Sequence, residues 1–169
     1  MKAKKNPGKE TQEKRNENKS VSEDEVSQPI AAIRIRGSVN TRKALSDTLD
    51  MLGLRRINNC VILPNNKPSK GMLKKAESFL TWGEIDKDTL EKLVYKRARL
   101  QGGKRPERAK TKSIAGNITK NCTLKYAGIK PVFRLTPPSK GHRPVKRLYP
   151  KGACGYRGKQ INELLNRML

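Results

Sequence analysis

Soft metal ligands are scarce in this sequence, which contains a single histidine, His142, and three cysteines. The cysteines, Cys60, Cys122 and Cys154, lie 62 and 32 positions apart and include no CxxC pair. That spacing excludes a zinc finger or zinc ribbon, which need ligands in close pairs. Widely spaced cysteines are typical of reduced, structural thiols in a reducing compartment. We therefore predict neither a metal site nor a cofactor.

Groups for acid–base or nucleophilic catalysis are equally few. A Ser-His-Asp or Cys-His arrangement could use only His142, and no acidic residue lies within twenty positions of it in the sequence. Asp47 and Asp50 are spaced i, i+3 on a predicted helix, where solvation and pairing with Lys43 or Arg55 explain them. An enzyme needs a constellation of such groups, so we predict that the chain is not an enzyme.

The glycine-rich stretch GACGYRGKQ (152–160) departs from the phosphate-binding pattern G-x-x-x-x-G-K-[ST]. Its outer glycines are one residue too far apart, and Gln160 stands where the pattern needs a magnesium-binding hydroxyl. Two interpretations stay open. Either the glycines, with Arg157 and Lys159, let the backbone approach an RNA phosphate, or the stretch is a flexible connector.

Aromatic residues and long apolar runs are also lacking. Only 4% of the residues are aromatic, which argues against RNA recognition by rows of stacking aromatics. The sequence has no apolar run of the roughly 18 residues that a membrane span needs, and no signal-peptide core near its start. These absences predict a soluble, cytoplasmic chain.

Positive charge is what the sequence has in excess. It contains 39 Lys and Arg against 15 Asp and Glu, a net charge of +24. A small domain needs roughly 2 to 8 charges for solubility, so the excess predicts a polyanionic partner, most commonly nucleic acid. A basic protein with nothing bound is the alternative. An anionic membrane surface is disfavoured, because no basic amphipathic helix or lipid anchor is present.

The charge is unevenly distributed along the chain. Residues 1–29 are polar and carry a net charge of only +1, so +23 lies in residues 30–169. Residues 108–162 contain 14 Lys or Arg and no acid. We predict that 1–29 is a disordered tail, because it has almost nothing to bury, and that the nucleic-acid contacts lie in the later part of the chain.

Residues 30–86 predict a compact α+β domain of β-α-β-α-β order, with a three-stranded antiparallel sheet and helices on one face. The strands are expected at 30–39, 57–63 and 78–85. The first strand alternates Ile with Arg34 and Arg36, which predicts one apolar and one basic face. The helices between the strands have predicted N-caps at Asn40 or Thr41 and at Ser69, and Gly53 ends the first helix.

Residues 87–169 predict a basic extension. A helix begins after Asp86, 101–106 is a linker, and 107–130 shows too weak a pattern for any element. Strands at 131–135 and 145–149 predict a β-hairpin around a loop that contains Pro137, Pro138 and Gly141. Apolar residues at i, i+3, i+4 and i+7 (Ile161, Leu164, Leu165 and Met168) predict a C-terminal amphipathic helix that docks on the body.

The candidate RNA-binding residues are basic and polar side chains that could reach phosphates. In the compact domain they are Arg34, Arg36, Ser38, Asn40, Arg42, Lys43, Arg55, Arg56, Asn58, Lys67, Lys70 and Lys74. In the extension they are Lys140, His142, Arg143, Lys146, Arg147, Lys151, Arg157 and Lys159. The compact domain could bring two helix N-termini, which bind phosphate well, to one edge. A scattered, solvated set of charges is the alternative.

Several blocks in fixed order resemble a known family. The blocks IRIRGSVN, DTLDMLGLRRINNCVILPNN, FLTWGEID, GIKPVFRLTPPSKGH and YRGKQINELLNRM are similar to the universal large-subunit ribosomal protein thirty family in its archaeal form. The resemblance covers most of residues 30–169. It implies a three-stranded sheet with two helices and a C-terminal extension. It also implies binding to large-subunit (23S-type) rRNA, near 5S rRNA and neighbouring ribosomal proteins, with no membrane and no small-molecule substrate.

Two other functions compete with this ribosomal interpretation. A free RNA chaperone or chromatin-like binder would use the same basic surface. An RNA-modifying enzyme or nuclease would need an active site, which could rest only on His142. The sequence therefore favours a structural rRNA-binding protein on the cytoplasmic ribosome.

Overall fold

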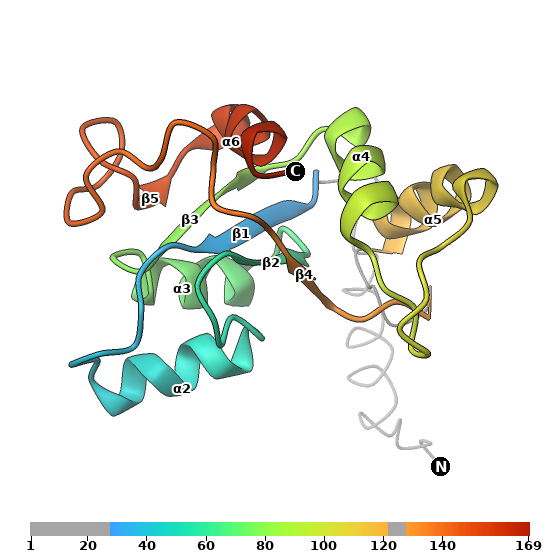
Figure 1. Cartoon of the computed structure of the whole chain (residues 1–169). Coiled ribbons are helices and arrows are strands. Elements are labelled where there is room, and N and C mark those ends of the chain that lie inside the picture. The colour runs from blue at the N-terminus through green and yellow to red at the C-terminus, as the bar shows by residue number, and fades with distance from the viewer. Residues whose placement is uncertain (1–27, 122–127) are drawn as a thin grey trace, which may run out of the picture.

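A mixed β-sheet forms the centre of the computed structural model, which describes residues 28–121 and 128–169 (Figure 1). Its strand order is β4-β2-β1-β3-β5. The strands are β1 (Ile30–Arg34), β2 (Asn59–Leu63), β3 (Leu80–Glu84), β4 (Val132–Arg134) and β5 (Gly155–Tyr156). The three predicted strands are present and antiparallel. The predicted three-stranded sheet is nevertheless wrong, because β4 adds an antiparallel edge and β5 adds a parallel one.

Helices cover both faces of this sheet. On one face, α2 (Lys43–Met51) and α3 (Lys67–Lys75) bury alternate strand residues such as Ile30 and Ala32. On the other face, α4 (Lys87–Arg97), α5 (Arg108–Asn121) and α6 (Ile161–Met168) cover Ala31 and Ile33. The two helices of the compact domain do share one face, as predicted, but the extension supplies a second helical layer.

Because this second layer covers the other face of the sheet, β1 is buried on both of its faces. Every residue of β1 is buried, so the predicted basic face does not exist within the strand. Arg34 is only 3% exposed, and Arg36 lies beyond the strand, half-buried. Successive side chains of a strand point to opposite faces, and a strand covered on both sides buries its charged residue along with its apolar ones.

The predicted β-hairpin is wrong. The segment 131–135 does form a strand, β4, but β4 pairs with β2 at one edge of the sheet. The segment 145–149 is mostly turn, and its one ladder contact is an isolated bridge between Leu148 and Cys154. The two segments therefore do not pair with each other. β5, which follows the turn at 145–149, pairs with β3 at the opposite edge of the sheet.

Helix ends follow the sequence better at their C-termini than at their N-termini. Gly53 ends α2 as predicted: its φ is +77°, its N–H donates to Asp50 O at 2.9 Å, and the Leu54 N–H donates to Leu49 O at 2.8 Å. This pair of bonds is a Schellman motif. The predicted N-caps of α2 and α3 are wrong, because Arg42 and Asn66 occupy those positions and Ser69 lies inside α3.

Two further predictions, on the start of α4 and on the apolar residues of α6, are confirmed, and one helix lies where none is predicted. Asp86 is the N-cap residue of α4, and the four predicted apolar residues of α6 are all buried. α5 occupies much of 107–130, for which no element was expected. Cys60 and Cys154 are free and buried, as structural thiols would be, and burial raises the pKa of Cys60 to about 12. Cys122 and nearly all of the predicted tail lie outside the described residues.

Candidate nucleic-acid interface

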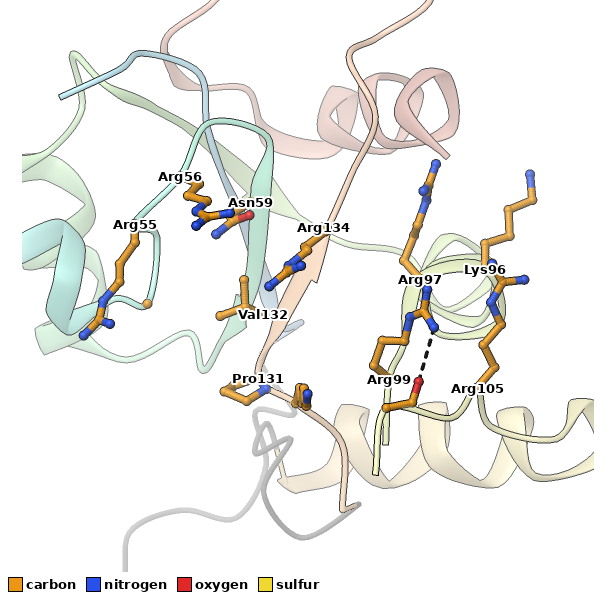
Figure 2. Close-up of a pocket in the computed structure, with 13 residues that line it drawn as sticks. Arg55, Arg56, Asn59, Lys96, Arg97, Arg99, Arg105, Pro131, Val132 and Arg134 are labelled. Carbon is orange, nitrogen blue, oxygen red and sulfur yellow. Dashed lines mark hydrogen bonds between the residues drawn. The ribbon is translucent and has the colours of Figure 1, made fainter. Parts of the chain in front are cut away.

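A basic groove lies between the sheet edge at β4 and the end of α4 (Figure 2). Its volume is about 730 Å³. We define it by its eight cationic residues, which come from three parts of the chain: Arg55, Arg56, Lys96, Arg97, Arg99, Arg105, Lys130 and Arg134. Gly53, Asn59, Gly103, Pro131 and Val132 complete its lining.

No acidic residue is among the 13 that line the basic groove. Arg55 makes an ion pair with Asp50 at 3.6 Å, but both side chains are well exposed to solvent, where such pairs are weak. A hollow walled by charges of one sign focuses its field and raises the local concentration of counter-ions. The groove is therefore built to attract a polyanion.

Arg34 fixes the wall that carries Arg55 and Arg56. Its guanidinium donates to the carbonyl oxygens of Leu54 and Arg55, each at 2.8 Å, and to that of Arg36 at 2.8 Å. Burial lowers the pKa of Arg34, yet arginine stays charged in proteins. Because its Nε and Nη1 groups donate to the backbone, Arg34 holds the α2–β2 turn in place beside the groove.

The opposite wall is held by Arg97 and the segment that follows α4. Arg97 donates to the hydroxyl of Thr136 at 3.1 Å and to the carbonyl oxygen of Leu169 at 3.2 Å. Arg99 donates to Gly103 O at 3.2 Å, the dashed line in Figure 2. The N–H of Lys130 donates to Arg99 O at 2.9 Å. These bonds join the end of α4 to the strand that forms the other side of the groove.

Strand β4 forms the near side of the groove and is an edge strand. It pairs with β2 alone, in the register Asn59–Arg134 to Val61–Val132. An edge strand leaves one row of backbone N–H and C=O groups without a partner strand. Val132 and Arg134 of this edge strand line the groove. A second hollow, about 350 Å³, adjoins it and shares Lys96, Arg97 and Arg105.

Most of the sequence-predicted residues of the compact domain lie outside the groove. Only Arg55 and Arg56 line it. The loop residues Ser38, Asn40 and Arg42 are exposed, as are Lys43 on α2 and Lys67, Lys70 and Lys74 on α3. Arg36 donates to Ser78 O at 3.3 Å and stacks 4.7 Å from the Phe79 ring centroid. Asn58 is half-buried with a φ of +61°.

The expected edge with two helix N-termini is wrong. α2 follows the end of β1 beyond Arg34, whereas α3 begins at Lys67, shortly after β2 ends at Leu63 (Figure 1). Leu63 pairs with Ile30, at the opposite end of β1. Because β1 and β2 are antiparallel, the two helices start at opposite ends of the layer. The two helix N-termini therefore do not meet at one edge.

The predicted residues of the extension occupy a second basic surface near β5, the sheet edge opposite the groove (Figure 1). There Lys140, Arg143, Lys146, Arg147, Lys151 and Lys159 are exposed, and His142 and Arg157 are half-buried. Arg157 donates to the Thr81 hydroxyl at 2.9 Å and to Ala153 O at 3.0 Å. The stretch 152–160 is therefore not a free connector: part of it is β5, and Arg157 braces it against β3.

Sequence reasoning missed six residues of the groove: Lys96, Arg97, Arg99, Arg105, Lys130 and Arg134. The basic residues of α4 were visible as a cluster, but they are far in sequence from Arg55 and Arg56. What brings them together is the pairing of β4 with β2 and a bridge between Leu100 and Ile129. The signal available was the acid-free run itself, which Lys130 and Arg134 share.

Two other kinds of site find no support within residues 28–121 and 128–169. No group of three or more His, Cys, Asp or Glu side chains is placed there to hold a metal ion. Among those same residues, no helix is both long enough and apolar enough to cross a membrane.

Comparisons with known proteins point in one direction. Residues 30–80 match the family model described as ribosomal protein L30p/L7e. The chain is 43% identical over 150 residues to large ribosomal subunit protein uL30 of Methanosphaera stadtmanae, covering 82% of the chain and 99% of that protein. The uL30 protein of Methanococcus maripaludis is 45% identical over 155 residues, covering 82% and 98%. That of Thermoplasma volcanium is 39% identical over 152 residues, covering 83% and 92%.

Proposed function

The chain belongs to the uL30 family of large-subunit ribosomal proteins, and we propose that it binds large-subunit rRNA through phosphate contacts in the basic groove. As a member of this family it is a ribosomal protein and not an enzyme. The basic groove is the surface that contacts the RNA. The observation that carries this proposal is the convergence of eight cations, without an acid, on one groove.

Six of those eight cations are arginines. A guanidinium presents a planar fork of donors that matches two phosphate oxygens. Phosphate contacts position a protein on RNA without reading its sequence. With only 4% aromatic residues, base stacking contributes little, so recognition rests on backbone charge and on the shape of the folded RNA.

The second basic surface extends the same proposal. Residues of the segment 140–159 lie at the sheet edge opposite the groove, so the protein presents cations on two sides. We infer that it lies between RNA segments: 23S-type rRNA in the groove, and a further segment, 5S rRNA or more of the large rRNA, at the second surface. Neighbouring ribosomal proteins are the remaining proposed partners.

A pair of matched triple variants tests the groove. Arg56, Lys96 and Arg134 line it and are exposed, and each is replaced by Gln. The control replaces Lys75, Lys92 and Lys112, which are equally exposed and line neither hollow at the groove, also by Gln. Both variants lose three positive charges. Filter binding to large-subunit rRNA is measured over a series of KCl concentrations, with circular dichroism to confirm the fold.

The groove variant is expected to bind more weakly than the control at each salt concentration. Affinity falls as salt rises, and each lost phosphate contact makes the slope of log affinity against log salt shallower by about 0.7 to 0.9. The magnitude of the slope should therefore decrease by about 2 to 3 in the groove variant and by much less in the control. Equal slopes and equal affinities in the two variants would show that net charge, not the groove, drives binding.

A further inference from the structure

A small hollow lies beneath the second basic surface, where the loop after β4 meets β5 and α6. Its volume is about 60 Å³, several times the ~10–15 Å³ that one water molecule requires. His142 and Arg143 line it from the loop, Arg157 from the end of β5, and Arg167 from α6. It shares no residue with the basic groove.

His142 has no partner in this hollow. Both ring nitrogens are buried and neither makes a hydrogen bond to any part of the chain that the structure describes. A neutral imidazole carries one donor and one acceptor, and leaving such groups buried without a partner costs roughly 1–3 kcal/mol. Buried polar atoms in proteins nearly always have a partner. The orphaned ring therefore indicates that something polar occupies the hollow.

Three guanidinium groups surround the same space, and each is held in place by hydrogen bonds to the chain. Arg167 donates to Ser139 O at 2.6 Å and to Gly141 O at 2.9 Å. Arg143 donates to Pro150 O at 2.9 Å. Arg157 is fixed by Thr81 and Ala153.

These bonds leave some N–H donors of the arginines without a partner among the described residues. The Nη1 groups of Arg157 and Arg167 make no hydrogen bond to the described residues. Donors held rigidly in this way bind an anion with little further loss of side-chain freedom. The hollow therefore offers prepositioned cationic donors as well as an unpartnered imidazole.

We propose that this hollow is a phosphate-binding site, in which His142, Arg157 and Arg167 together hold one tetrahedral oxyanion. The ligand is a phosphate group, either free or within an RNA backbone. His142 then acts as a hydrogen-bond donor to a held phosphate. A surface stacking contact with a base would leave its buried nitrogens unexplained.

The charges around His142 make the site sensitive to pH. Burial, Arg157 and Arg167 lower its pKa from the ordinary value of 6.5, so the empty site favours the neutral ring. The other groups that face it are Arg143 and Tyr149 from the loop and Glu163 from α6. Glu163 makes no ion pair with any described residue. A bound oxyanion would favour the imidazolium form, which donates from both nitrogens.

Because His142 is the only histidine of the chain, proton NMR of the full-length protein reports it without assignment. Its Hε1 shift is followed against pH in chloride, in sulfate, and with a diribonucleoside monophosphate, at equal ionic strength. In chloride the pKa should lie below 6.5. An anion within about 4–6 Å raises a cation's pKa by one unit or more, so sulfate should raise that of His142 by about one unit.

The two anions distinguish the sources of the phosphate. A rise with both means that an RNA backbone phosphate can enter the site. A rise with sulfate alone assigns the site to a free inorganic anion. Either result supports the site, and neither depends on how the groove variants bind rRNA. If neither anion moves the pKa of His142, the hollow is not a phosphate site.

Two variants that each lose one positive charge sharpen this test. Arg157→Gln removes a guanidinium that lines the hollow, whereas Lys146→Gln removes an exposed cation of the same loop that does not. The sulfate-induced rise should disappear in the first and persist in the second. If Arg157→Gln does not fold, the wild-type titration still decides the proposal. Loss of the rise in Lys146→Gln as well would show a general charge effect and overturn it.

Discussion

Arg34 is a basic residue whose guanidinium donates hydrogen bonds to the backbone of this chain. It lies at the end of β1, almost fully buried, and donates to three carbonyl oxygens. Two of these, Leu54 O and Arg55 O, belong to the turn that presents Arg55 and Arg56 to the groove. A lysine would keep the charge but could not span separate carbonyls with one planar fork.

Arg34→Lys should therefore destabilise the fold by about 1–3 kcal/mol, the cost of leaving buried hydrogen-bonding groups unpaired. Urea unfolding measures this change. Arg42→Lys is the control, because Arg42 is exposed and its side chain makes no capping bond, and its effect should stay within about 0.5 kcal/mol. Unchanged stability together with weaker rRNA binding would instead assign Arg34 a direct phosphate contact.

At the scale of elements, the attachment of β5 depends on a very close approach of two backbones. A Cβ atom added to Gly83 of β3 would lie 2.1 Å from the carbonyl oxygen of Gly158, just after β5. Two bonds of Arg157 to β3 depend on the same approach. The Arg157 side chain donates to the Thr81 hydroxyl at 2.9 Å, and the Arg157 backbone N–H donates to Trp82 O at 2.9 Å. The edge strand and the hollow at His142 are thus positioned by a glycine.

Gly83→Ala should destabilise the protein by about 1–3 kcal/mol or more, because the clash is with backbone that cannot turn aside. Gly71→Ala is the matched control. Gly71 lies inside α3 with nothing within 4 Å of an added Cβ, so alanine should stabilise the helix by about 0.5–1 kcal/mol. Thermal unfolding compares the two, and a similar effect at both positions would contradict the close packing of β3 against residue 158.

Elements with strong local signals could be predicted from the sequence, and those set by pairing could not. The apolar period of α6 and the glycine that ends α2 depend on neighbours within a few residues. The partners of β4 and β5 lie about 70 residues away in the sequence. Segments 131–135 and 145–149 are predicted to form a hairpin because strands that are adjacent in sequence pair most often. In the structure, β4 pairs instead with β2, and β5, which follows the second segment, pairs with β3.

At the scale of the whole molecule, tertiary pairing turns a diffuse charge into local surfaces. The net charge of +24 predicted a polyanionic partner, but it could not say where the cations gather. Arg55 and Arg56 were recognised from the sequence, and the other six cations of the groove were not. They converge only once β4 has joined β2 and the end of α4 has joined residues 129 and 130.

The most direct test of the groove is to map RNA contacts in the assembled particle. Large subunits are purified, irradiated to crosslink protein to rRNA, and digested, and the peptides that carry nucleotide adducts are identified by mass spectrometry. The groove predicts adducts on peptides that contain Arg56, Lys96 or Arg99, and Arg134. Adducts confined to the exposed lysines of α3, with the groove peptides unmodified, would contradict the account.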